Sequence, residues 1–153
     1  MNIKKEIYHL DADTLPTMPV PHDCVIKTIL VDRDNSCISF IFEDDIAEYD
    51  SVAYQRPNAK SLVIKYHLTG KNEYELYKFL KPSIWHRNGG YECLTDYEKG
   101  THRTLIKLAE DNLEYLSHYV AYNAVAVELW GAKAKSVILK LDVETVEYEW
   151  GYE

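Results

Sequence analysis

The sequence predicts an α+β fold in which antiparallel β-strands dominate, arranged as a curved sheet or a sandwich with one helix near residues 101–121. Three observations support this prediction. Several runs alternate apolar and polar side chains with the period of a strand, turn-forming residues separate these runs, and only one stretch has helical spacing. A mostly-β sandwich or an open barrel is the alternative. With 153 residues and neither a repeat nor a linker, the chain suits a single domain over residues 1–153.

The run from Val137 to Trp150 contains a break in its alternation. Up to Val143 every second residue is apolar, but from Val146 onward the apolar residues are one position out of step. Because strand side chains alternate between two faces, a straight strand would place the later set in water. One extra residue near positions 144–145, a β-bulge, returns them to the core face. The outer face then carries an acidic stripe of Asp142, Glu144, Glu147 and Glu149.

The first half of the chain contains shorter runs of the same kind. Residues 1–19 have little periodicity, and their prolines favour a loosely structured lead-in. Two strand-like runs follow, joined by a turn at residues 32–35, and residues 44–60 have the composition of a loop. Across the whole chain, the clearest expected strands are 24–31, 37–42, 61–68, 125–129 and 137–150.

The segment after position 72 contains a second hairpin signal. Residues 73–80 fit either a strand or a short helix, and Pro82 ends either one. Asn88-Gly89-Gly90 then separates the apolar runs 84–87 and 91–94. A glycine-rich pair between two such runs is typical of a tight β-hairpin turn.

One stretch follows a helical period. From Leu105 to Val120, apolar residues recur at spacings of four, four, three and four, which places them on one face of a helix. Thr101 is a suitable N-cap residue. The tyrosines after Asn112 favour strand and count against the helix in its second half.

Charge and composition narrow the classes of function. A formal net charge of −8 speaks against binding to nucleic acids or to an anionic membrane surface. No apolar stretch reaches the length of about 18 residues expected of a membrane span, and the start of the chain lacks the apolar core of a signal peptide. The three cysteines are far apart and form neither a disulfide framework nor a zinc motif. We therefore expect a cytoplasmic protein without a cofactor, and the sequence leaves its oligomeric state open.

Two local patterns resemble catalytic or metal-binding sites. Residues 32–43 place oxygen ligands at the spacing of a calcium-binding loop, but the sixth position is Cys37 rather than glycine and the following residues alternate as a strand. We expect no metal there. His22, Asp23 and Cys24 could form the base and nucleophile of a hydrolase, but neighbouring residues of an extended segment point to opposite faces. No other catalytic motif occurs, so an enzyme is not the favoured interpretation.

Two other groups of residues could bind a partner or a ligand. Trp85, His86 and Arg87 could hold an aromatic or anionic ligand, although a Trp that covers the core beside a hairpin turn is the simpler interpretation. The second group combines the stripe with the run that begins at Glu43, Asp44 and Asp45 and continues to Glu48 and Asp50. Acidic residues among tyrosines suit a basic protein surface, and protection of an edge strand is the alternative explanation.

Three short segments resemble a known group of proteins. These are Pro21-His-Asp-Cys24 before an apolar strand, Ile38-Ser-Phe-Ile-Phe42 after a turn, and the ending Val146-Glu-Tyr-Glu-Trp150. Together they are similar to small uncharacterised bacterial β-rich domains, some of which are thought to be immunity proteins that neutralise polymorphic toxins. The resemblance supports the partner-binding interpretation, in which a non-enzymatic domain uses its acidic, tyrosine-rich surface against a basic protein. A small-ligand-binding β-domain with a pocket near Trp85, His86 and Arg87 is the alternative.

Overall fold

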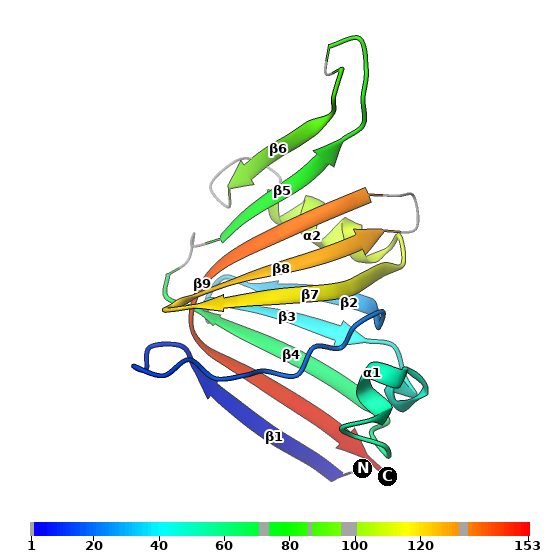
Figure 1. Cartoon of the computed structure of the whole chain (residues 1–153). Helices are drawn as coiled ribbons and strands as arrows, with labels where there is room; N and C mark the ends of the chain where they lie inside the picture. Colours follow the sequence, from blue (N-terminus) through cyan, green and yellow to red (C-terminus); the bar gives the residue numbers. More distant parts are fainter. Residues whose placement is uncertain (1, 71–73, 86, 96–100, 132–134) are drawn as a thin grey trace.

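The computed structural model describes residues 2–70, 74–85, 87–95, 101–131 and 135–153. Nine strands form one sheet in which every pairing is antiparallel (Figure 1). The strands are β1 (Asn2–His9), β2 (Val25–Asp32), β3 (Cys37–Phe42), β4 (Ser61–Leu68), β5 (Tyr74–Leu80), β6 (Gly90–Thr95), β7 (Leu113–Ala121), β8 (Ala124–Gly131) and β9 (Lys135–Tyr152). The helices are a 3-10 turn η1 (Ile46–Glu48), the short α1 (Asp50–Ala53) and the main helix α2 (Thr101–Ala109). The predicted α+β class, dominated by antiparallel strands, is confirmed.

The long strand β9 organises the sheet. Its first half pairs with β8 and β5, and its second half pairs with β4 and β1. From β4 the pairing continues through β3, β2 and β7 to β8, so that these strands and β9 close into a ring. The ring is weakest between β2 and β7, which pair at only two positions. The hairpin of β5 and β6 stands outside the ring and projects from the rest of the molecule (Figure 1).

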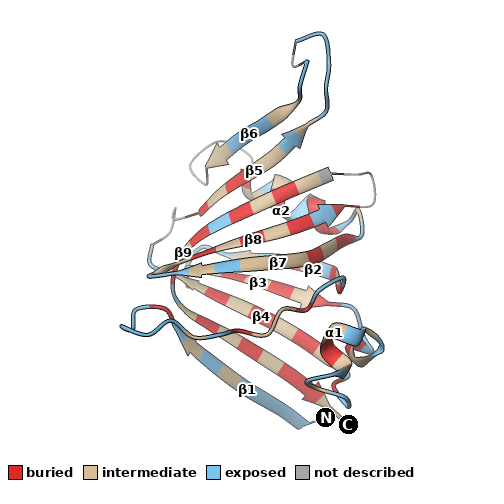
Figure 2. Ribbon diagram, in the orientation of Figure 1, coloured by how far each residue is buried: buried red, intermediate tan, exposed pale blue. Residues whose placement is uncertain are grey.

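The bulge predicted in the last strand is present. Opposite β4, His67 pairs with Thr145 and Leu68 with Val143, so Glu144 is the extra residue and its side chain is exposed. The apolar residues on both sides of it consequently face the same core, as the alternation of buried and half-buried positions along β9 shows (Figure 2). The buried set on β9 is Val137, Leu139, Leu141, Val143, Val146, Tyr148 and Trp150.

The helix is shorter than its apolar spacing predicts. It ends at Ala109, and residues 113–121 form strand β7 instead of helical turns. Asn112 has a left-handed backbone conformation with φ of 54°, which turns the chain away from the helix axis. Leu113 fits the period of a strand as well as that of a helix, and pairing with β2 and β8 decides between the two. Tyr115 is buried two residues later, as the period of a strand requires.

Residues 2–9 are not the loosely structured lead-in that the sequence suggests. They form β1, which pairs with β9 from Asn2 opposite Tyr152 to His9 opposite Thr145. Ile3 and Ile7 are exposed, so β1 has no apolar alternation by which it could be recognised. Backbone pairing, ion pairs to β9 and the edge-to-face contact of Tyr8 with Tyr148 hold it instead.

The second hairpin uses a different first strand from the one expected. Residues 74–80 are strand rather than helix, and they, not residues 84–87, pair with β6. Pro82 lacks the N–H that would continue the ladder, so the connection begins at position 81. Gly89 closes it with φ of 73°, and a Cβ there would lie 2.7 Å from the carbonyl oxygen of Leu80.

Three segments between strands were expected to be loops or turns. The expected loop over residues 44–60 contains η1 and α1. Thr69-Gly-Lys-Asn72 and Gly131-Ala-Lys-Ala-Lys135 have the composition of turns, and both segments lie largely outside the described residues. Among the residues that the structure describes, no helix is long and apolar enough to cross a membrane.

Candidate functional site

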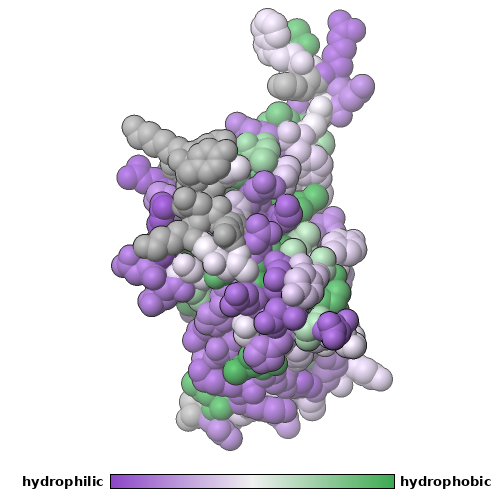
Figure 3. Space-filling model, turned by 90° about the vertical axis from the view of Figure 1, so that its left-hand side faces the viewer, coloured by the Kyte–Doolittle hydropathy of each residue, from purple (hydrophilic) through white to green (hydrophobic). Residues whose placement is uncertain are grey.

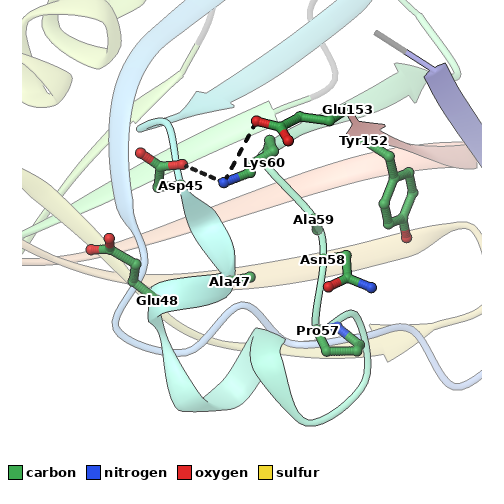
Figure 4. A pocket seen from close by; sticks show the side chains of 9 residues that line it. All are labelled: Asp45, Ala47, Glu48, Pro57, Asn58, Ala59, Lys60, Tyr152 and Glu153. Carbon is green, nitrogen blue, oxygen red and sulfur yellow. Dashed lines mark hydrogen bonds and ion pairs between the residues drawn. The ribbon is translucent and has the colours of Figure 1, made fainter.

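An acidic groove lies at the end of the molecule where β9 finishes. The hollow has a volume of about 650 Å³ and extends along Asp44 and Ser61. Four carboxylates line it, from Asp44, Asp45, Glu48 and Glu153, against a single cation, Lys60. The other lining residues are Ala47, Pro57, Asn58, Ala59 and Tyr152 (Figure 4). We call this surface the acidic groove.

The chain between β3 and β4 builds one wall of the groove. Ile46, Val52 and Ala59 are buried, and they anchor this excursion to the core. Asp45 has a left-handed conformation with φ of 58°, which aspartate tolerates better than most residues, and its N–H donates to the carbonyl of Lys60 at 2.7 Å. The N–H of Lys60 in turn donates to the carbonyl of Gly151 at 2.8 Å. These bonds fix the acidic segment against the end of β9.

The charges of the groove are only partly neutralised. The ammonium of Lys60 lies 3.3 Å from the carboxylate of Asp45 and 4.0 Å from that of Glu153, between the two (Figure 4). The hydrogen bond to Asp45 raises the pKa of Lys60. Asp44 lies 3.6 Å from Lys27. Glu48 has no ion pair with any residue of the described ranges.

Further carboxylates surround the groove. A smaller hollow beside it shares Glu48 and is lined by Asp23 and Asp50 as well. Glu43 immediately precedes Asp44 and is exposed. Like Glu48, Glu43 and Asp50 make no ion pair within the part of the chain that the structure describes. This end of the sheet therefore carries a strong local excess of negative charge.

The acidic stripe of β9 has a different environment. Glu147 and Glu149 are mostly buried, with side chains 14% and 16% exposed. Lys5 on β1 lies 2.8 Å from Glu147 and 2.7 Å from Glu149, and Lys65 on β4 lies 2.8 Å from Glu149. Burial alone would raise the pKa of Glu149, but the hydrogen bonds from the two lysines outweigh it and lower that pKa to about 2.

The stripe is consequently not one continuous acidic surface. Glu147 and Glu149 lie between two paired strands, so they do not protect a free edge, and flanking cations neutralise them. Glu144 at the bulge is exposed, and Asp142 is half-buried where β9 pairs with β8. The structure does not bring these two to the acidic groove, whereas it places Glu43, Asp44 and Asp45 there or next to it.

Four tyrosines pack in the core, whereas Tyr152 lines the acidic groove. Tyr66, Tyr115 and Tyr148 are completely buried, and Tyr74 nearly so. The hydroxyls of Tyr66 and Tyr115 lie 3.3 Å apart, and Tyr148 donates to the carbonyl of Pro19 at 2.8 Å. Burial raises the pKa of all three completely buried phenols. Tyr152 is the tyrosine that lines the groove.

The candidate ligand site at Trp85, His86 and Arg87 lies on the projecting hairpin. Trp85 is 89% exposed and Arg87 is exposed, so neither has walls of protein around it. His86 lies outside the described residues. Trp85 does not cover the core, as the simpler interpretation of the sequence would have it, because the connection after Pro82 carries it away from the sheet.

The residues of the suspected hydrolase site do not form a nucleophile–base pair. Cys24 is buried, and its burial raises the pKa of the thiol to about 12. The Nδ1 of His22 donates to the carbonyl of Leu116 at 2.6 Å, and Nε2 lies 3.3 Å from Asp23. The hydroxyl of Ser51 donates to the carbonyl of His22 rather than to its ring. The imidazole of His22 and the hydroxyl of Ser51 therefore make structural contacts, and neither is placed to activate the thiol of Cys24.

Residues 32–43 do not fold as a calcium-binding loop, because residues 37–42 form an extended strand. Asp32 and Glu43 are at opposite ends of the extended strand β3, so they cannot share a cation. Asp32 instead accepts hydrogen bonds from the backbone N–H and the side chain of Asn35, at 3.0 and 2.7 Å, which stabilise the turn. Within the described ranges, no cluster of three or more His, Cys, Asp or Glu residues could hold a metal ion.

Lys60, Tyr152 and Glu153 are the groove residues that sequence reasoning missed. They carry no motif, and only the pairing of β4 with β9 brings them to the acidic segment. Comparisons with protein-family models, with curated proteins and with solved structures found no match to this chain.

Proposed function

We propose that this protein is a non-enzymatic binding protein that occludes a basic surface of a partner protein with its acidic groove, in the manner of an immunity protein. The observation that carries the proposal is the excess of carboxylates around an open hollow, with Glu48 and its neighbours Glu43 and Asp50 unpaired among the described residues. Unpaired charges at a concave surface attract an oppositely charged partner and orient it.

The composition of the groove suits a basic protein segment. Ala47, Pro57 and the ring of Tyr152 offer apolar contact beside the carboxylates. A Lys or Arg side chain has a long apolar stem and a charged end, so it can use both kinds of surface at once. A nucleic acid would meet only repulsion from these carboxylates.

A cytoplasmic location is part of the proposal. The three cysteines are free, and one of them, Cys93, is exposed on β6. Free thiols persist in a reducing compartment.

The proposal is tested with two short synthetic peptides, one of alternating lysine and glycine and one of alternating glutamate and glycine. Amide resonances of Ala47, Ala59 and Tyr152 should shift on titration with the lysine peptide and stay unchanged with the glutamate peptide. The double variant Glu48→Lys/Glu153→Lys should bind the lysine peptide about tenfold more weakly, since each rim charge contributes up to about 1 kcal/mol.

The matched control introduces a positive charge away from the groove. Asp34→Lys changes an exposed residue in the turn between β2 and β3, at the other end of these strands. This variant should bind the lysine peptide as the parent does. The control raises the net charge by two and the groove variant by four. If the control lost half of the binding free energy that the groove variant loses, only net charge would matter and the proposal would be wrong.

A further inference from the structure

The tip of the β5–β6 hairpin exposes large apolar side chains. Ile84 and Trp85 are each 89% exposed, whereas Trp150 in the core is 1% exposed. Phe79 and Tyr91 form an edge-to-face pair at the base of the tip, with ring centroids 5.7 Å apart, and both are partly exposed. Exposed apolar groups that cluster on a projection are typical of a contact surface.

The same tip is basic, in a protein whose net charge is −8. From Lys78 to Tyr91 the sequence holds three cations, Lys78, Lys81 and Arg87, and no aspartate or glutamate. Lys81 and Arg87 are exposed, four residues before and two residues after Trp85 in the sequence. In Figure 3 the hairpin stands above the rest of the surface, with hydrophobic and hydrophilic groups side by side. Tip and acidic groove are thus opposite in charge.

Tip and groove cannot meet within one molecule. The hairpin pairs with β9 between Val137 and Leu141, and the groove lies at Tyr152 and Glu153, beyond the other end of that strand. About 12 extended residues, or roughly 40 Å along the strand, separate the two. In Figure 1 the hairpin is at the top and both ends of the chain are at the bottom.

We propose that the hairpin tip of one copy docks into the acidic groove of a second copy. Trp85 would contact Pro57 and Tyr152, while Lys81 and Arg87 would pair with Glu48 and its neighbouring carboxylates. The groove volume of about 650 Å³ lies within the usual range of binding pockets, roughly 300–1,000 Å³. This inference rests on the proposed capacity of the groove to bind basic protein surfaces, and it adds a second copy of the chain as one such surface.

The proposed contact is head to tail. Each copy retains a free tip at one end and a free groove at the other, so association continues into a ring or a chain instead of stopping at a symmetric dimer. Because the two surfaces are opposite in charge, association should weaken as salt concentration rises.

Two variants and their mixture test the contact. The tip variant is Trp85→Ala/Arg87→Gln, and the groove variant is Glu48→Lys/Glu153→Lys. In sedimentation velocity, the mean mass of the parent should grow with protein concentration, and each variant alone should stay monomeric, with self-association at least about tenfold weaker. A mixture of the two should form a one-to-one dimer and stop there, because only one intact tip and one intact groove can meet.

Several outcomes would overturn the inference. These are a parent that stays monomeric at millimolar concentration, a variant that associates as the parent does, or a mixture that remains monomeric. The lysine peptide, titrated into the same samples, separates the two proposals: a monomeric parent that binds it keeps the groove function and loses the self-association. Loss of binding to anionic phospholipid vesicles in the tip variant, with a monomeric parent, would assign the tip to a lipid surface instead.

Discussion

Replacing Trp150 by alanine should lower the free energy of unfolding by about 3–5 kcal/mol, the usual cost of removing a buried Trp side chain. Its ring is 1% exposed and lies 6.0 Å from the ring of Tyr148 between centroids. The guanidinium of Arg56 lies 5.5 Å from the ring centroid, and the indole N–H donates to Glu6 at 3.2 Å. The alanine variant therefore loses packing, a cation–π contact and a hydrogen bond to a half-buried carboxylate.

Urea unfolding followed by circular dichroism measures this loss, with Trp85→Ala as the control. The control removes the same side chain from an exposed position and should change stability by less than about 0.5 kcal/mol. For a chain of this length, about 1 kcal/mol corresponds to 2–4 °C, so Trp150→Ala should also melt roughly 6–20 °C earlier. Equal stability of the two variants would refute the placement of the last strand, and with it the bulge.

The strands with one buried face could be predicted because burial has a period of two. On β9 the shift in alternation alone located the extra residue near positions 144–145, since a strand without it would expose Val146, Tyr148 and Trp150, and the register with β4 identifies it as Glu144. The same reasoning could not find β1. Its position depends on pairing with residues about 140 positions away and on ion pairs such as that of Lys5 with Glu149, which leave no local pattern.

The position at which α2 ends, Ala109, could not be predicted from neighbouring residues either. Leu105, Ala109 and Leu113 fit a helical face, yet Leu113 also fits the buried face of a strand. When two periods agree over a few residues, pairing with other strands decides between them, here with the neighbouring β8 and, at Leu113, with Ile26 of the distant β2. Tyrosines after Asn112 were the one signal in the sequence that favoured the strand.

The acidic surface was predictable only where its residues are close in sequence. Asp44, Asp45 and Glu48 lie within five positions, so any compact turn keeps them together. Glu147 and Glu149 look equally acidic in the sequence, but the fold places lysines from two neighbouring strands against them. Charge that is neutralised across a sheet cannot be distinguished from free charge until the strand order is known.

Three other results are expected. At pH 8, a thiol reagent should label Cys93 readily and Cys24 only on unfolding, because burial raises the pKa of the Cys24 thiol to about 12. Fast labelling of Cys24 in the native protein would contradict this. The free energy of unfolding should also fall as pH rises from about 9 towards 12, because the thiol ionises there only in the unfolded chain. The stabilisation from Glu149, whose pKa is lowered to about 2, should be complete above pH 4.5 and disappear as pH falls towards 2, and Glu149→Gln should flatten this acid dependence in urea unfolding. Calcium should leave the melting temperature unchanged, because Asp32 is committed to its turn; a rise of several degrees would indicate a native-state site.

The basic tip and the acidic groove differ in how they would contribute to the affinity of the proposed contact between two copies. Exposed carboxylates are screened at physiological salt, so they speed and orient an encounter more than they hold a complex together. Under the proposed docking, lasting contact would have to come from apolar surface, and the groove offers Tyr152 and Pro57 for the exposed Trp85. Salt should therefore mainly slow association, whereas Trp85→Ala should mainly speed dissociation. If the alanine variant instead altered only the association rate, charge steering alone would account for the contact, and the apolar tip would need another partner.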